Sequence, residues 1–234
     1  MKAIIVRPVA IRNVVCRSVI TMGLVAAIVA AAGDRAGALS NARALDTAAA
    51  AFAKVTDYQM NVSVHETSSD RVEDRVYSVW FKNPAQERVE IDAGPDKGRQ
   101  IVWQGGAKVK TRRSGLLGRL RATLDLHDGA VSTLRGDSID TLTIPAMLAD
   151  FTAIKGKIFQ GPGPEIAGAH SIAVTLAVED PAVDSGVTRI VLYLSDATHL
   201  PVRRERFSGA LLVKTEDLTD LRVNAGLTAA DFPW

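Results

Sequence analysis

The four histidines are the residues best suited to metal binding or proton transfer, and they are scattered along the chain. His65, His127, His170 and His199 do not stand at i, i+3 or i, i+4 spacing, or in an HxH pattern, with another metal ligand. A zinc site needs three or four converging donors, usually from His, Cys and acidic side chains. The sequence therefore predicts no metal site, and we expect no cofactor.

Patterns for covalent catalysis are also missing from the sequence. No serine stands in a G-x-S-x-G pattern, and no phosphate-binding loop is present. The single cysteine, Cys16, lies in the N-terminal region. Neighbouring acids such as Glu216 and Asp217 occupy a predicted strand, where consecutive side chains point to opposite faces. We therefore expect a protein that is not an enzyme.

The N-terminal region has the pattern of a secretory signal peptide. Basic residues (Lys2, Arg7, Arg12 and Arg17) precede an apolar run from Val19 to Ala32, and Ala36-Gly37-Ala38 follows as a small-x-small cleavage site. We expect cleavage after Ala38 and a periplasmic or otherwise extracytoplasmic location, with an uncleaved N-terminal anchor as the alternative.

Removal of this region changes the charge of the protein. The whole chain carries +2, whereas residues 1–38 contain five basic residues and one acid. The remaining 196 residues carry −2, so the charge gives no reason to expect a nucleic-acid partner. That length suits one domain with a sizeable core. No repeat or linker divides residues 39–234, which we expect to form a single domain.

Successive strands with one apolar face dominate the predicted structure. In Tyr58–Glu66, for example, Met60, Val62 and Val64 alternate with polar residues. The same alternation recurs in later segments, and Ile172 and Ile190 belong to it. The residues that we expect to line an apolar ligand cavity are Met60, Val62, Val64, Val79, Phe81, Val89, Ile91, Ile101, Trp103, Val174, Leu176, Leu192 and Leu194.

Three segments are predicted to be helical. An alanine-rich segment, residues 42–55, repeats Leu45, Ala48, Ala49, Phe52 and Val55 on one face. Residues 144–154 form a second candidate, with Pro145 in the first turn. A third candidate lies in residues 116–127, where we expect a lid formed by Leu116, Leu117, Leu120 and Leu124.

One helix cannot cover a strongly curved sheet of about nine or ten strands. We expect the inserted helices to act as a lid, with the space beneath them open to an apolar ligand. The alternative is an ordinary core in which the protein's own side chains fill that space.

Several segments resemble the outer-membrane lipoprotein carrier superfamily, whose members include the LolA and LolB carriers, the N-terminal domain of the regulator RseB and outer membrane lipoprotein-sorting proteins. The resemblance is carried by DYQMNVSVHE, VWFKNPAQERVEI, QIVWQGGAKVKTR and, best of all, DATHLPVRRERF with LLVKTEDLTDLRVNAGLTAADF. It covers nearly all of residues 39–234.

The resemblance implies a mainly β fold with some α: an unclosed antiparallel β-barrel of about 10–11 strands, lidded by an N-terminal helix and inserted helices. It implies a monomeric extracytoplasmic carrier for the acyl chains of lipids or lipoproteins, with a membrane-associated donor or acceptor protein as a partner. By the same resemblance, Arg88 stands where the carriers place a strand arginine and is a candidate polar gate. The alternative function is an RseB-like periplasmic sensor, a regulatory binding module.

Overall fold

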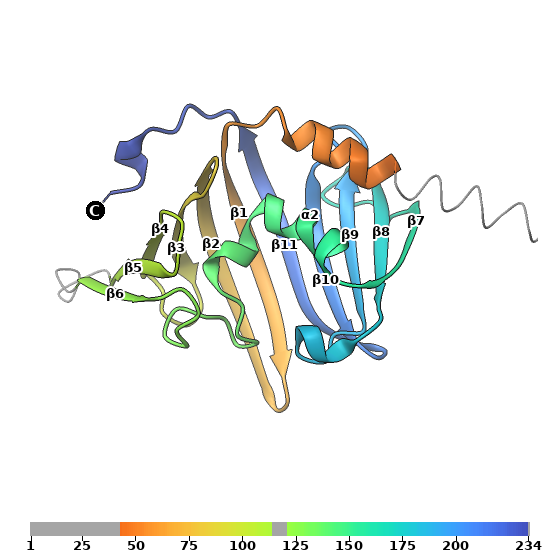
Figure 1. Ribbon diagram of the computed structural model, residues 1–234, viewed down its shortest axis with the longest axis horizontal. Coiled ribbons are helices and arrows are strands. Elements are labelled where there is room, and N and C mark those ends of the chain that lie inside the picture. The colour runs from red at the N-terminus through yellow and green to blue at the C-terminus, as the bar shows by residue number, and fades with distance from the viewer. Residues whose placement is uncertain (1–42, 114–120, 234) are drawn as a thin grey trace, which may run out of the picture.

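An antiparallel sheet of eleven strands forms most of the described chain (Figure 1). The computed structural model describes residues 43–113 and 121–233. Within these residues the sheet order is β6-β5-β4-β3-β2-β1-β11-β10-β9-β8-β7. The strands are β1 (Asp57–Ser68), β2 (Arg71–Lys82), β3 (Gln86–Ala93), β4 (Gln100–Trp103), β5 (Lys108–Arg112), β6 (Arg121–Asp125), β7 (Gly156–Pro162), β8 (Ser171–Val178), β9 (Arg189–Ser195), β10 (Pro201–Ser208) and β11 (Leu211–Val223).

The sheet is a meander in which the first strand also pairs with the last. Pairing of β1 with β11 places the N-terminal and C-terminal halves side by side, with Val62 opposite Leu218. Strands β6 and β7 form the two edges and do not pair with each other in the described residues. The sheet is therefore unclosed, as the family resemblance implied.

Alternation of side chains gives the sheet one buried face. In β1, Tyr58, Met60, Val62 and Val64 are at most 4% exposed, whereas the residues between them are more accessible. Tight turns keep the strands in register. Gly94 has φ +88°, and a Cβ atom there would lie 2.1 Å from the carbonyl oxygen of Asp74, so only glycine fits.

Helical elements are few and short. The N-terminal helix is described over residues 43–52, and the others are η2 (Ile139–Leu142), α2 (Ile144–Ala153), η3 (Pro181–Asp184) and η4 (Ala229–Asp231). The hydroxyl of Thr143 accepts a hydrogen bond from the Ala146 amide and caps α2. The buried face of α2 consists of Ile144, Met147 and Phe151, at helical spacing.

The long connection between the two edge strands crosses the buried face of the sheet. We call residues 126–155, which include η2 and α2, the cover segment, and the sheet face beneath them the inner face. Figure 1 shows α2 and the turn before it crossing in front of β1, β11 and β10. A meander that ends at opposite edges requires such a crossing, so the chain topology itself supplies the cover.

The C-terminal segment packs on the opposite, outer face. Leu227 and Phe232 form a small apolar cluster with Val102, and Trp80 packs against it. Lys82 also donates a hydrogen bond to the carbonyl oxygen of Leu227. The outer face of β2–β4 is thereby partly covered by residues that follow β11.

The helix predicted at residues 144–154 is confirmed as α2, and the N-terminal helix is confirmed over residues 43–52. The helix expected over residues 116–127 is wrong in its described part, because Leu124 lies on strand β6 opposite Val109. Leucines at this spacing fit either structure, and pairing with the free edge of β5 decides in favour of a strand. Leu116, Leu117 and Leu120 lie outside the described residues.

Among residues 43–113 and 121–233, no helix combines the length and the apolar character needed to span a membrane.

Candidate ligand-binding face

The thirteen residues predicted to line an apolar cavity all belong to the inner face. Twelve of them are at most 4% exposed, and Trp103 is partly buried against the same cluster. They come from two regions of the sheet. Nine lie on β1–β4, and the other four, Val174, Leu176, Leu192 and Leu194, lie on β8 and β9. The structure thus brings the predicted residues together, while contact with a ligand stays a prediction.

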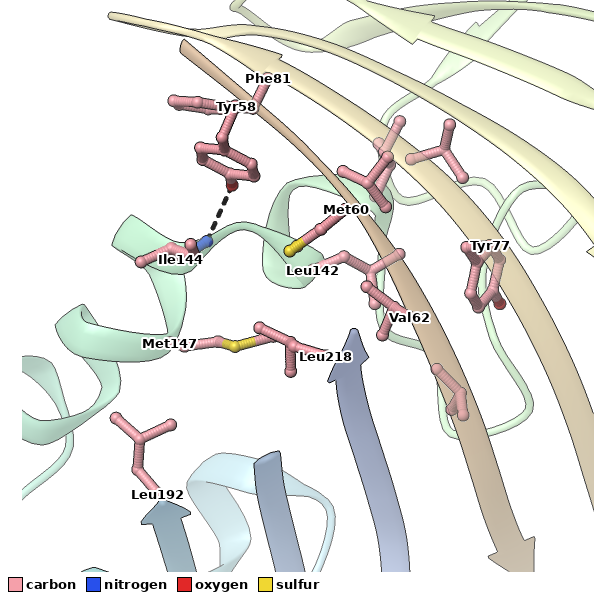
Figure 2. Packing of buried hydrophobic residues seen from close by; sticks show 14 of the residues in the cluster. Tyr58, Met60, Val62, Tyr77, Phe81, Leu142, Ile144, Met147, Leu192 and Leu218 are labelled. Atoms are coloured by element: carbon pink, nitrogen blue, oxygen red, sulfur yellow. Dashed lines mark hydrogen bonds between the residues drawn. The ribbon is translucent and has the colours of Figure 1, made fainter. Parts of the chain in front are cut away.

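The cover segment contributes the other half of this core. Leu142, Ile144 and Met147 project toward the sheet, where Figure 2 shows them facing Met60, Val62 and Leu218. The Ile144 amide donates a hydrogen bond of 3.0 Å to the hydroxyl oxygen of Tyr58. Apolar contacts and this hydrogen bond hold the start of α2 against β1.

The space between sheet and cover is small in this closed arrangement. A cavity lined by Tyr77, Val89, Ile91, Ile139 and Leu142, among others, has a volume of about 10 Å³. That is near the smallest space that holds one water molecule, whereas pockets for organic ligands measure about 300–1,000 Å³. Among the described residues, the protein's own side chains fill the space around this cavity, which corresponds to the alternative of an ordinary core.

A cluster of buried charges lies in the middle of the inner face. We call this the ionic cluster; its members are Glu66, Asp137, Asp150, Arg204, Arg206, Lys214 and Glu216. Glu66, Arg204, Lys214 and Glu216 are at most 1% exposed. The register places Glu216 between Arg204 on β10 and Val64 on β1. The ionic cluster thus lies beside the single apolar core that joins β1–β5 to β8 and β9.

Arg204 joins the sheet to the cover segment. Its guanidinium forms a two-point ion pair with Glu216, in which one contact measures 2.8 Å. It also donates to the Asp150 carboxylate on α2 at 2.8 Å and to the carbonyl oxygen of Thr141 in η2 at 3.0 Å. The planar guanidinium has five N–H donors and can therefore bind partners in both the sheet and the cover segment. Each charged hydrogen bond is stronger than a neutral one.

Asp137 gives the cover segment a second charged attachment. Its carboxylate accepts from Arg206 at 3.0 Å and from Lys214 at 2.5 Å. Lys214 also lies 2.7 Å from Glu66 on β1. Two carboxylates of the cover segment, Asp137 and Asp150, are therefore held by three cations of the sheet.

The charges in this cluster strongly favour the ionised forms. Burial alone would raise the pKa of Glu216, but Arg204 and Lys214 outweigh burial and lower it to about 2. Burial opposes ionisation of Asp137 as well, and Lys214 and Arg206 hold its pKa well below the ordinary value. Glu216 and Asp137 therefore stay ionised at neutral pH.

Glu87 is a buried acid that, unlike the acids of the ionic cluster, has no cation as a partner in the described residues. Its side chain is 0% exposed, and neither carboxyl oxygen has a hydrogen-bond partner in the described residues. Burial raises the pKa of Glu87 well above its ordinary value, and the nearby Asp140 raises it further. The buried environment therefore favours the uncharged form of Glu87.

Arg88, the candidate polar gate, points to the outer face. Its guanidinium lies 4.0 Å from the centre of the Trp80 ring and donates to the carbonyl oxygen of Asp231 at 2.9 Å. Alternation along β3 puts Glu87 and Val89 inside and Arg88 outside. Its position supports attachment of the C-terminal segment, and it does not support a gate at the inner face.

The described residues contain no group of three or more His, Cys, Asp or Glu side chains placed to hold a metal ion. The arrangement offers an apolar surface, a fastened cover and one unpartnered carboxyl group.

Comparison with known proteins gives a match at the level of structure. No family model matches the sequence, and no curated protein matches it significantly. An uncharacterized conserved protein from Thermus thermophilus superposes with a TM-score of 0.53 and 12% identity, covering 83% of this chain and 93% of that one.

MucB superposes with a TM-score of 0.50 and 14% identity over 84% of this chain, which spans 63% of the MucB chain. The lipoprotein LppX of Mycobacterium tuberculosis gives a TM-score of 0.50 and 13% identity, covering 81% of this chain and 98% of LppX. This chain has a LolA/LolB/RseB-like fold. At these identities the likeness establishes the fold alone, and the resemblance predicted from the sequence is confirmed to that extent.

The ionic cluster and Glu87 were missed by the sequence interpretation. The signal for the cluster lay in β10 and β11, where VRRERF and VKTED carry charges at both alternating positions. One set of charges must then face inward. Glu87 shares its phase with Val89 and Ile91, so its burial followed from the same alternation.

Loss of the central cation should destabilise the protein strongly. Lys214→Met leaves Glu66 without its buried cation and takes one of two cations from Asp137, and we expect the free energy of unfolding to fall by about 3–5 kcal/mol. Urea denaturation at pH 7 measures this change. The matched control is Lys108→Met, which removes an exposed pair with Asp125 and should cost less than about 1 kcal/mol. Equal effects of the two substitutions would contradict the role given to the cluster.

Stability should also fall in acid. The pKa of Glu216 drops from an ordinary value of 4.5 to about 2 on folding, so its contribution is complete above pH 4.5 and is lost as the pH falls through 2. A shift of this size corresponds to about 3 kcal/mol. Urea denaturation at pH 7, 5, 4 and 3 follows the loss, and a free energy of unfolding that stays constant down to pH 3 would refute it.

Proposed function

We propose that this protein is an extracytoplasmic carrier that binds the acyl chains of lipids or lipoproteins between its inner face and its cover segment. The observation that carries the proposal is the way in which the cover segment packs on the apolar face of the sheet. A broad apolar face on an unclosed sheet is covered by a connection that packs on it through side chains and lies outside the strand pairing. The resemblance of the sequence to the outer-membrane lipoprotein carriers supports this class of function.

Binding requires the cover segment to move, because the closed core has no room for a chain. An acyl chain would take the place of Leu142, Ile144 and Met147 against Met60, Val62 and Leu218. Each buried CH₂ group contributes about 0.8 kcal/mol. Burial of a long acyl chain therefore offsets the apolar contacts that are lost when these side chains leave the sheet.

The ionic cluster sets the cost of opening. Movement of α2 and η2 separates Asp150 and the Thr141 carbonyl from Arg204, while the pair of Arg204 with Glu216 stays within the sheet. The sheet cations thus keep a partner after the cover segment leaves. The closed state is favoured without a ligand. Only the open state binds, so the apparent affinity equals the affinity of the open state multiplied by the fraction of protein that is open.

The N-terminal sequence supports an exported protein, because residues 1–38 carry the pattern of a signal peptide. The proposed location is the periplasm or another extracytoplasmic space. Neither a cofactor nor a catalytic residue enters the proposal. The partner proteins would be membrane-associated donors and acceptors of the acylated ligand.

A second candidate is a sensor or regulatory binding module of the RseB type. The fold shared with MucB favours it. Such a module would bind acyl chains in the same place and pass the signal to a protein partner. The two candidates differ in whether the ligand is delivered to an acceptor, which a lipid-transfer assay between donor and acceptor vesicles distinguishes.

The direct test is recovery of a bound lipid. The protein is purified after export without detergent, extracted with organic solvent and analysed by mass spectrometry. We expect acylated molecules at a substantial molar ratio. Protein that carries no lipid, and that also fails to bind the uncharged apolar fluorophore N-phenyl-1-naphthylamine, would contradict the proposal.

Weakening the attachment of the cover segment should increase binding. Asp150→Asn removes the charge that holds α2 to Arg204 while leaving the pair with Glu216, so the open state becomes more populated. Each tenfold rise in affinity for N-phenyl-1-naphthylamine corresponds to about 1.4 kcal/mol of closed-state destabilisation. The matched control, Asp125→Asn, alters an exposed ion pair on β6 and should leave affinity unchanged. Unchanged binding by Asp150→Asn would contradict the opening step.

A further inference from the structure

Glu87 lies at one end of the apolar inner face, in a row of side chains set by strand register. Phe81 on β2 and Trp103 on β4 are its direct cross-strand partners. Tyr58 on β1 is in turn opposite Phe81, and their rings stack with centres 5.0 Å apart. The carboxyl group therefore stands between aromatic side chains, with η2 of the cover segment above.

A carboxyl group in this position destabilises the closed protein. Both oxygens are buried without a hydrogen-bond partner in the described residues, and burial of a polar group without a partner is unfavourable. The buried acids of the ionic cluster, by contrast, are all paired with cations. A methionine would fill the same space without this cost, so packing gives no reason for an acid here.

The neighbouring charge excludes one class of partner. Asp140 in η2 is the charged group that acts on Glu87, and it is also an acid. A ligand with a carboxylate or phosphate at this end would be repelled by Asp140, and its charge would favour the uncharged form of Glu87 further, so it would gain no cationic partner there. A ligand that donates hydrogen bonds or carries a positive charge would satisfy the unpartnered oxygens.

We propose that Glu87 binds the polar end of the ligand and selects alkyl chains whose polar group donates hydrogen bonds, an ammonium above all and then a hydroxyl, over chains that end in an anion. This inference rests on the proposed function, because it needs an apolar chain on the inner face. Cover-segment opening admits the ligand, and the ammonium supplies the counter-charge that favours the ionised form of Glu87 in the complex. Phe81 and Trp103 contact the first carbons of the chain.

The test compares three ligands with the same twelve-carbon chain. Dodecylamine, dodecanol and dodecanoic acid compete at pH 7 with N-phenyl-1-naphthylamine for the wild-type protein. We expect dodecylamine to bind at least tenfold more tightly than dodecanoic acid, with dodecanol between them. Charged hydrogen bonds of this kind are strong enough to give such a ratio.

Substitutions at residue 87 assign the preference to this side chain. Glu87→Gln keeps hydrogen-bonding atoms without the charge, so it should lose the preference for dodecylamine and retain binding of dodecanol. Glu87→Met should bind all three chains within about threefold of one another. Glu90→Gln is the matched control, because Glu90 lies on the same strand and faces outward; it should keep the wild-type preference.

Urea denaturation and the relative affinities of the three chains together distinguish a wrong inference from a wrong function and from a misfolded variant. Urea denaturation at pH 7 should show Glu87→Met to be at least as stable as the wild type, so lost preference cannot reflect unfolding. If the wild type binds all three chains equally, or if Glu87→Met keeps the preference, this inference is wrong and the carrier function stands. If no chain binds, both are wrong.

Discussion

The closed structure depends on the contact between three buried cations of the sheet and two carboxylates of the cover segment. Arg204, Arg206 and Lys214 project from the inner face of β10 and β11, where a strand would ordinarily present apolar side chains. Removing such charges from water is costly unless partners surround them. Glu66 and Glu216 supply partners within the sheet, and Asp137 and Asp150 supply them from above. The cover segment is thus fixed by charge at the middle of the sheet and by apolar packing on β1–β5.

This arrangement gives the cover segment two kinds of attachment with different consequences. The apolar contacts of Leu142, Ile144 and Met147 can be replaced by another apolar body, such as an acyl chain. The charged contacts cannot be replaced in that way, but Arg204 and Lys214 keep Glu216 and Glu66 when the cover leaves, and Arg206 keeps Asp184 of η3. A cover held like this favours the closed state without making opening prohibitive. Glu87 adds a local destabilisation at the far end of the same apolar face.

Much of the fold could be predicted from the sequence, because period-two alternation is strong in β1, β2 and β9. Thr143 and Pro145 likewise mark the start of α2. Residues 116–127 were harder, since leucine spacing fits a short helix as well as a strand, and the edge of β5 decided between them. The apolar face was predicted residue by residue. Its occupancy was not, because whether Leu142 and Met147 fill the space depends on where the chain crosses the sheet.

The burial of the charged residues could not be predicted from the sequence for a different reason. A strand such as VRRERF has no apolar phase, so alternation could not tell which charges face inward. Only pairing of Arg204 with Leu192 on β9 and Glu216 on β11 fixes that phase. Arg88 was assigned by resemblance, and alternation with its buried neighbours Glu87 and Val89 places it outside.

The central claim is that an acyl chain enters by displacing the cover segment. Hydrogen–deuterium exchange of the exported protein, with and without a saturating long-chain ligand, tests it most directly. The account predicts that amides of residues 139–154 lose protection when the ligand binds, while those of β1 and β2 keep theirs. Tight ligand binding with unchanged protection across residues 139–154 would contradict it.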